Sequence, residues 1–350
     1  MSVNLLPILL SCSGFALVVV GFIRLFKASH PQIHTAEPVS VLLPFRNEEL
    51  HQTLMLERLD RTELEPLDRW IFIDDHSRTP WEPELPHFAE MHSLNDQVGS
   101  KKRALQFAIQ RTENPIICTT DADCSNESNW ILSMRQACTS TTNLVIGPVL
   151  MKPGSTFVSQ ISSMESLALL TVTLGSAGLK IPLMCSGANL LFRKSAWQEV
   201  GGYSEHIAQQ SGDDVLLMQA IWLKNPKSVK AQFHPDAVVY TEAPQSWREF
   251  LHQRKRWASK AAHIMHYKKL ILSFLMILWT VSPWFLWALS LPTFIILLLS
   301  EFIWIVWLTR FFKMPINIPM WYLFRLLYPI LFVVLPFVPP GKWKPASPTL

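Results

Sequence analysis

The chain has 350 residues, of which 49% are hydrophobic and only 17% charged, and its formal net charge is +4. Soluble domains average about 25% charged residues, so this composition argues against a wholly soluble protein, and the small net charge argues against a nucleic-acid-binding one. The five cysteines are odd in number and include no Cys-x-x-Cys pair, which argues against a disulfide framework or a structural zinc site and suits a reducing compartment.

The N-terminal segment is predicted to anchor the chain in a membrane. Residues 1–23 carry no charged side chain, and the apolar run 5–23 is long enough to cross a bilayer. Arg24 and Lys27 follow this run, whereas a cleaved signal peptide would carry its positive charge before it. By the positive-inside rule we expect an uncleaved anchor, residues 1–31, whose carboxyl end lies in the cytoplasm.

The next part of the chain alternates strand-like and helix-like patterns. Apolar runs occur at 38–49, 70–77, 116–123 and 144–147, and the first three end in acids or polar loops. Residues 101–109 place apolar side chains at helical spacing. Strands that alternate with helices favour right-handed βαβ units and a parallel sheet. We therefore predict an α/β domain over residues 32–240.

Two of these runs end in paired acids. Asp74 and Asp75 end one run, and Asp121 and Asp123 end another at i, i+2 spacing. Open α/β sheets bind ligands outside the carboxyl ends of their strands, where two carboxylates can share one hard divalent cation that holds a diphosphate. The alternative interpretation of Asp121 and Asp123 is a capped strand followed by an Asx turn.

Three further segments of this region have two interpretations each. Residues 157–180 predict an apolar helix over the sheet or against the membrane surface, or else an ordinary core helix. The small residues within 185–193 allow a close approach of the backbone to a ligand, or form a turn before a strand. Residues 211–217 begin a helix in which Asp213 or Asp214 is either the N-cap or a base that faces the cleft.

The C-terminal third is basic first and apolar afterwards. Residues 246–269 contain Gln-Arg-Lys-Arg-Trp in a basic, amphipathic pattern, which predicts a helix on an anionic membrane surface within an interfacial region 241–269. Residues 270–309 hold Glu301 as their only ionisable side chain, and they suit two spans, 270–287 and 291–308. An ionisable residue inside a span is a functional candidate.

The last apolar segment, 321–338, is interrupted by Arg325, Pro329 and Pro336. It is either a third span or a re-entrant segment, and these alternatives place the following lysines on opposite sides of the membrane. The predicted transmembrane region covers residues 270–340, and a tail at 341–350 follows it.

Four motifs occur in an order that resembles the family 2 glycosyltransferases. They are Asp74-Asp75, Thr120-Asp-Ala-Asp123, Gly212-Asp-Asp214 and Gln253-x-x-Arg256-Trp257. The entry segment 41–49 and the Gly-Ala-Asn stretch fit the same family, and the resemblance covers about residues 38–260. With its flanking membrane segments the chain is similar to the membrane-embedded branch, which includes ceramide glucosyltransferase and polysaccharide synthases.

The chain departs from the family pattern at two places. Gly212-Asp-Asp214 replaces the commoner Thr/Glu-Asp pair, which leaves the choice between Asp213 and Asp214 open. His76 stands where glycine is usual.

The resemblance implies a GT-A fold, which is a Rossmann-like mixed, mostly parallel sheet, here with interfacial helices and transmembrane α-helices. It implies an inverting single displacement from a UDP-sugar, in which Asp75 accepts from the uracil ring with Asp74 nearby. The donor-binding residues expected from it are Pro44, Arg46, Glu48, Asp74, Asp75, Lys101, Asp121, Ala122, Asp123, Gln253, Arg256 and Trp257. For Lys101, a solvated helix face is the alternative to a position near the diphosphate.

The expected chemistry divides between a metal and a base. We expect Asp123, with Asp121, to hold Mg²⁺ or Mn²⁺, because both ions prefer oxygen ligands. Asp214 is the expected general base, with Asp213 as the alternative. The residues expected on the acceptor side are Gly187, Ala188, Asn189 and Trp257.

We therefore expect a metal-dependent glycosyltransferase that is a multi-pass protein of the cytoplasmic membrane, with its catalytic domain in the cytoplasm and a lipid hydroxyl as its acceptor. The expected partners are the UDP-sugar, the lipid and the membrane, and nucleic acid is not among them. The alternatives are a polyprenyl-phosphate sugar synthase, a short-chain polysaccharide synthase and, from another class, an inactive lipid-binding membrane scaffold.

Overall fold

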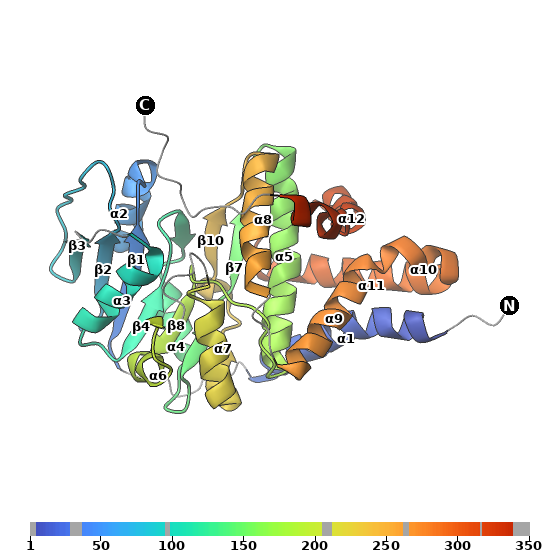
Figure 1. Cartoon of the computed structure of the whole chain (residues 1–350), viewed down its shortest axis with the longest axis horizontal. Coiled ribbons are helices and arrows are strands. Elements are labelled where there is room, and N and C mark those ends of the chain that lie inside the picture. The colour runs from blue at the N-terminus through green and yellow to red at the C-terminus, as the bar shows by residue number, and fades with distance from the viewer. Residues whose placement is uncertain are drawn as a thin grey trace. The chain divides into compact units, whose positions relative to one another are not determined.

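The computed structural model describes residues 5–28, 37–94, 99–204, 212–261, 266–315 and 317–338. The chain divides into two units, each described by itself. We call Ser29–Val149, Met184–Glu242 and Lys342–Leu350 the sheet unit, and Met1–Ala28, Leu150–Leu183 and Ala243–Gly341 the helical unit. Figure 1 labels their elements. The predicted domain boundaries remain predictions.

The sheet unit has the alternating elements that the apolar runs predict. Its strands are β1 Val39–Phe45, β2 Arg69–Asp74, β3 Ala89–Ser93, β4 Ile116–Thr119, β5 Cys124–Asn126, β6 Leu144–Ile146, β8 Leu190–Arg193, β9 Val229–Ala231 and β10 Val239–Glu242. Its α-helices are α2 Gln52–Arg61, α3 Lys101–Arg111, α4 Trp130–Gln136, α6 Lys194–Glu199 and α7 Val215–Lys224. Its short 3₁₀ helices are η1 Glu49–His51, η3 Pro226–Ser228 and η4 Pro235–Ala237. Strand β7, Val149–Lys152, lies where the chain passes from this unit to the other.

The main sheet has seven strands in the order β3-β2-β1-β4-β8-β6-β9. Strands β1, β2, β3 and β4 are mutually parallel, β8 runs antiparallel to β4 and β6, and β6 is parallel to β9. This arrangement confirms the predicted mixed, mostly parallel sheet. Since Phe45 pairs with Asp74 and Thr119 with Leu190, the ends of β1, β2 and β4 and the start of β8 lie at one edge of the sheet. We call it the carboxyl edge.

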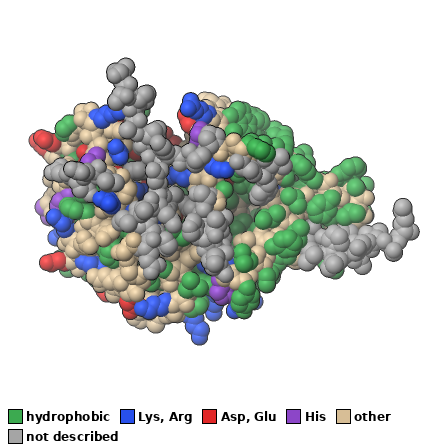
Figure 2. Space-filling view, viewed as in Figure 1, with side chains coloured by type: hydrophobic (Ala, Val, Ile, Leu, Met, Phe, Trp, Pro, Cys, Tyr) green, Lys and Arg blue, Asp and Glu red, His purple; other side chains and the backbone are tan. Residues whose placement is uncertain are grey.

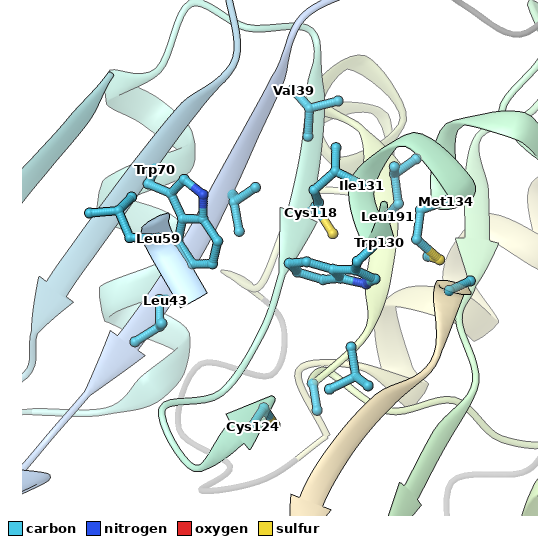
Figure 3. Packing of buried hydrophobic residues seen from close by; sticks show 14 of the residues in the cluster. Val39, Leu43, Leu59, Trp70, Cys118, Cys124, Trp130, Ile131, Met134 and Leu191 are labelled. Carbon is cyan, nitrogen blue, oxygen red and sulfur yellow. The ribbon is translucent and has the colours of Figure 1, made fainter. Parts of the chain in front are cut away.

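The core of the sheet unit is apolar and rich in tryptophan. Figure 3 shows Trp70 and Trp130 packed among Leu43, Leu59 and Cys118, with their ring centroids 6.3 Å apart. The strand residues alternate between the two faces of the sheet, and all seven residues of β1 are buried, as expected for a strand covered on both faces. This rigid core fixes the loops of the carboxyl edge in place.

The helical unit contains the N-terminal helix and the C-terminal third of the chain. Its helices are α1 Leu5–Ala28, α5 Phe157–Gly178, α8 Trp247–Ala261, α9 Tyr267–Val281, α10 Pro283–Leu289, α11 Leu291–Phe311, α12 Ile318–Leu327, α13 Ile330–Val334 and the 3₁₀ helix η5 Leu335–Phe337. Helix α1 packs closely on α5, because a Cβ atom on Gly178 would lie 1.9 Å from the Gly21 carbonyl oxygen. Small residues allow such a close approach of two helix backbones.

Two described helices, α5 and α11, are long and apolar enough to cross a membrane. Helices α9 and α10 would form a third crossing element if they are taken together, but they meet at a bend of 67°. Figure 2 shows hydrophobic side chains gathered over the C-terminal helices, where Leu270, Ile271 and Phe274 of α9 and Ile296 and Ile303 of α11 are exposed. Helix α1 has 24 residues, and its membrane crossing stays a prediction.

The C-terminal helices are interrupted at three places. The predicted basic helix 246–269 is interrupted at His266, whose extended backbone precedes a new helix that begins at Tyr267. The predicted span 270–287 is broken, because Pro283 begins a new helix and cannot donate a hydrogen bond to the preceding turn. Segment 321–338 divides into α12, α13 and η5, each far shorter than the roughly 20 residues of a transmembrane helix.

Candidate active site

The carboxyl edge collects most of the residues singled out in the sheet unit. Asp74 ends β2, Asp121 and Asp123 follow β4, and Gly187 precedes β8. The parallel order of β2, β1 and β4 brings these loops to one side, since parallel strands end at a common edge. Two helices also contribute, because α3 begins at Lys101 and α7 begins directly after Asp214.

Lys101 is the centre of an acidic cluster. Its ammonium nitrogen donates to Asp121 Oδ1 and lies 3.6 Å from Asp213 Oδ2. Burial lowers the pKa of Lys101, but the carboxylates of Asp121 and Asp213 outweigh it and hold the pKa above its usual value. Lys101 is therefore held in its charged form, and because its side chain is only 15% exposed it does not lie on a solvated helix face.

Gly187 forms the floor of this cluster. A Cβ atom at this position would lie 3.0 Å from Asp213 Oδ2 and 3.4 Å from the Lys101 nitrogen, so a side chain would crowd both groups. The Gly187 carbonyl oxygen accepts from the Thr119 hydroxyl at 2.7 Å, which ties the turn to the end of β4. The backbone of this turn thus lies close to the acidic cluster, in agreement with the predicted close approach of the backbone at this turn.

Asp214 and Asp213 have different partners. Asp214 caps α7 by accepting from the Val215 amide at 2.7 Å, and its other oxygen accepts from the Gly187 amide at 3.1 Å. Asp213 instead faces Lys101. Tyr203 is buried nearby, and burial together with the charges of Asp213 and Asp214 raises its pKa well above the usual value.

Asp123 lies on the β5 side of the same loop. Its Oδ2 atom accepts from the Thr241 hydroxyl of β10 at 3.2 Å, and the thiol of the neighbouring Cys124 donates to Oδ1 at 3.5 Å. Strands β5 and β10 pair antiparallel, so Cys124 lies opposite Thr241. Ala122 between the two acids is buried in the core cluster, which anchors the tip of the loop.

The loops after β1 and β2 are held together by hydrogen bonds. The amide of Asn47 donates to the Ser77 hydroxyl at 2.9 Å, and the amide of Ser77 donates to Asp74 Oδ1 at 2.8 Å. Asn47 and His76 both have positive φ, at 52° and 64°. The His76 value gives a physical reason for the glycine that the family pattern has there, because glycine adopts this conformation without strain.

The remaining predicted donor residues of the sheet unit border these two loops. The carboxylate of Asp75 is buried, and its Oδ1 atom lies 3.0 Å from His76 Nδ1. Glu48 Oε2 lies 2.8 Å from His51 Nδ1 and accepts a hydrogen bond when that ring nitrogen carries the proton. Pro44 is buried within β1, and Arg46 is the first residue after that strand.

Sequence reasoning missed Arg58, a buried residue of α2. Its guanidinium donates to the Asp121 carbonyl oxygen at 2.8 Å, to the Thr120 hydroxyl at 2.7 Å and to Asn126 Oδ1 at 2.8 Å. Its guanidinium carbon lies 5.6 Å from the centre of the Trp70 ring and 5.7 Å from that of Trp130, and burial lowers the pKa of Arg58. A signal was present, because Arg58 occupies the apolar face of α2 between Met55 and Leu59.

Asn189 differs from its expected place on the acceptor side. Its side chain is fully buried, donates to the carbonyl oxygens of Pro148 and Ala237 at 2.8 Å each, and accepts from Trp130 Nε1 at 2.9 Å. These bonds use the amide group inside the core, so the geometry gives Asn189 a structural role. Ala188 is also part of the core cluster.

The fourth motif lies in the helical unit. Gln253, Arg256 and Trp257 are all on α8 and partly buried, and Gln253 Oε1 accepts from the guanidinium of the neighbouring Arg254. Within the described part of the chain, no three His, Cys, Asp or Glu side chains are grouped as a metal site by themselves. At the carboxyl edge, the carboxylates of Asp121 and Asp213 both face the Lys101 ammonium.

Comparison with known proteins gives consistent results. The probable glycosyltransferase YdaM of Bacillus subtilis (strain 168) is 23% identical over 240 residues, which are 63% of this chain and 54% of YdaM. The chain thus spans about half the length of this curated relative. Among solved structures, the mannosyltransferase PcManGT from Pyrobaculum calidifontis, in complex with GDP-Man and Mn²⁺, has a TM-score of 0.54 and 15% sequence identity, and the match covers 94% of this chain and 95% of that one.

The structural likeness confirms the predicted GT-A fold class. The family model described as glycosyl transferase family group 2 matches residues 116–338, from the strand before Asp121 to the C-terminal helices. The match covers more than half of the chain, and the protein therefore belongs to glycosyl transferase family group 2.

Proposed function

We propose that this protein is a membrane-bound, inverting, metal-dependent glycosyltransferase that transfers a sugar from a UDP-sugar to the hydroxyl group of a lipid on the cytoplasmic side. One observation carries the proposal: the carboxylates of Asp121 and Asp213 both face a single cation, the Lys101 ammonium, at the carboxyl edge of the sheet. An excess of carboxylate at this position can hold a divalent cation, and the cation can in turn hold the diphosphate of the donor.

The donor set fits Mg²⁺ or Mn²⁺. The oxygens of Asp121 and Asp123 are hard ligands, and Mg²⁺ sites commonly combine one or two carboxylates with substrate phosphates. When bound, the ion would stabilise the negative charge of the leaving diphosphate as a Lewis acid. Arg58 would hold the loop of both acids still through its bonds to Thr120 and Asp121. The solved neighbour PcManGT was determined with Mn²⁺.

The chain's own side chains would perform the remaining steps. Lys101 would neutralise part of the diphosphate charge, as a permanently charged ammonium does well. Asp214 would take the proton from the acceptor hydroxyl, since Asp213 is already directed at Lys101 on the donor side. Asp75 would accept from the uracil ring, and the hydrogen bond from the Asn47 amide to the Ser77 hydroxyl would help to fix its loop.

The helical unit supports a lipid as the acceptor. Helices α5 and α11 are long and apolar enough to cross a membrane, and exposed apolar side chains cover α9 and α11. An acceptor that resides in the membrane would explain why this catalytic family member carries such helices.

The decisive experiment is product analysis. The purified protein is incubated with a panel of UDP-sugars, and with GDP-mannose, in the presence of a total lipid extract, with and without EDTA, and new lipids are identified by mass spectrometry. A single metal-dependent glycolipid formed from a UDP-sugar supports the proposal. A phosphodiester-linked sugar, an oligomer, or no product with any donor would support instead a polyprenyl-phosphate sugar synthase, a polymer synthase or an inactive scaffold, respectively.

A further inference from the structure

A residue between the motif positions organises the fourth motif. Arg254 of α8 is buried, and its guanidinium donates to Gln253 Oε1. Its guanidinium carbon lies 4.6 Å from the centre of the Trp257 ring and 4.1 Å from that of Phe250. Arg254 therefore contacts two of the three motif side chains, and the Trp257 contact is a cation–π stack that orients the ring.

Glu165 of α5 holds Arg254 in this place. Glu165 Oε2 accepts from Arg254 Nε at 2.7 Å and also from Nη2, and both side chains are buried. Tyr328, just after α12, is close enough to interact with the same carboxylate. A buried guanidinium without its carboxylate is strongly disfavoured, so Arg254 can lie against Trp257 only while Glu165 is charged and close.

We propose that Glu165 and Arg254 are positioning residues for the Gln253-x-x-Arg256-Trp257 motif. The pair sets the side chain of Gln253 and the ring plane of Trp257, since Glu165 holds Arg254 from the neighbouring helix α5. The inference rests on the proposed function for one part only, namely that Gln253 and Trp257 contact the substrates. The geometric part concerns the orientation of the Trp257 ring and is testable without turnover.

The chain supplies a matched control. Glu301 of α11 and Arg325 of α12 form a second buried ion pair in the same unit, with distances of 2.9 Å from Arg325 Nε and Nη2. This pair contacts α9 and not α8 in its hydrogen bonds: Trp279 Nε1 donates to Glu301 Oε1 at 2.6 Å, and Arg325 donates to the carbonyl oxygens of Trp279 and Thr280. Both pairs are equally enclosed, so they differ chiefly in which tryptophan they orient.

The first experiment is ¹⁹F NMR of the full chain labelled with 5-fluorotryptophan, in lipid nanodiscs. The resonances of Trp257 and Trp279 are assigned as those absent from Trp257→Phe and Trp279→Phe. Glu165→Gln and Arg254→Lys should shift or broaden the Trp257 resonance and spare that of Trp279, because lysine keeps the charge of arginine but loses its planar stacking and forked donors. Glu301→Gln should shift or broaden the Trp279 resonance and leave the Trp257 resonance unchanged.

The second experiment measures kcat/KM for the nucleotide sugar that is found to be the active donor. Glu165→Gln should lower kcat/KM for the nucleotide sugar by about tenfold to a hundredfold through loss of orientation, and Glu301→Gln should leave kcat/KM per folded protein unchanged. If Glu165→Gln does not fold, the double variant Glu165→Met/Arg254→Met replaces it, because removal of both charges of a buried pair is often tolerated.

The outcomes are distinct. An unchanged Trp257 resonance in the folded double variant overturns the inference. If the wild type is active, an unchanged kcat/KM in Glu165→Gln, or in the double variant that replaces it, also overturns the inference. A shifted Trp257 resonance in a protein that transfers no sugar from any donor contradicts the proposed function and leaves the geometric part of the inference supported.

Discussion

The sheet unit and the helical unit each place charged groups away from water, but they balance the charges differently. At the carboxyl edge one ammonium, that of Lys101, faces the carboxylates of Asp121 and Asp213, and the Asp121 side chain is still 36% exposed. In the helical unit Glu301 and Arg325 match one to one, and the Glu301 side chain is fully buried. Arg325 uses its remaining donors on the carbonyl oxygens of Trp279 and Thr280, near the bend between α9 and α10.

This difference separates a site from a structural brace. A buried ion pair whose two charges cancel offers no net charge to a ligand, whereas a partly exposed excess of carboxylate can bind a cation. The sequence marks Glu301 as a functional candidate because it is ionisable within an apolar segment. Its contacts give it a structural role instead.

The largest effect on turnover is expected at the carboxylates that follow β4. Asp121→Asn/Asp123→Asn should abolish turnover, because the amide groups cannot replace two anionic ligands of a divalent cation. Mn²⁺ binding, measured by calorimetry in the presence of UDP, should be lost together with glycolipid formation. Asp60→Asn on the exposed face of α2 is the control and should change neither quantity. Full Mn²⁺ binding by the double variant would contradict the proposed site.

The next effect distinguishes the two acids before α7. Asp214→Asn should lower kcat about a hundredfold to ten thousandfold and remove the acidic limb of the pH–rate profile, as expected when a general base is lost. Asp213→Asn should act mainly on donor KM, since Asp213 faces Lys101. The reverse pattern would assign the base to Asp213, which is the alternative that the sequence leaves open.

A third test concerns the balanced pair. Glu301→Gln should destabilise the protein by about 3–5 kcal/mol, because it leaves the Arg325 guanidinium buried without a counterion. Thermal unfolding in nanodiscs measures this loss. Glu301→Met/Arg325→Met should restore most of the stability, since no uncompensated charge remains. A single variant as stable as the wild type would show that the pair is not the brace described above.

The smallest effect is expected at Arg58, which supports the acidic loop from behind. Arg58→Lys should weaken Mn²⁺ binding about tenfold, because lysine cannot donate to Asp121, Thr120 and Asn126 together. Arg61→Lys is a matched control on the same helix, where the Arg61 side chain is 71% exposed. Equal effects of the two substitutions would argue that Arg58 acts only through stability.

The sequence predicted the sheet unit better than the helical unit. The apolar runs at 38–49, 70–77 and 116–123 correspond to β1, β2 and β4, because a strand that is buried on both faces carries a continuous local signal. The break of the predicted basic helix before Tyr267 and the bend at Pro283 were not predicted, although the proline was visible. Apolar composition reports burial or membrane contact, and it does not report where the helix axis turns.

The sequence by itself determined which residues carry the acids, which strands they follow and that the chain is a family 2 glycosyltransferase, since each of these depends on local order along the chain. Only the tertiary structure decided how the charges are paired. Arg58 and Asp121 are distant in sequence, as are Glu165 and Arg254 and Glu301 and Arg325. Whether a buried charge is a brace or a ligand site depends on the partners that the fold brings within hydrogen-bond distance, and local patterns carry no information about those partners.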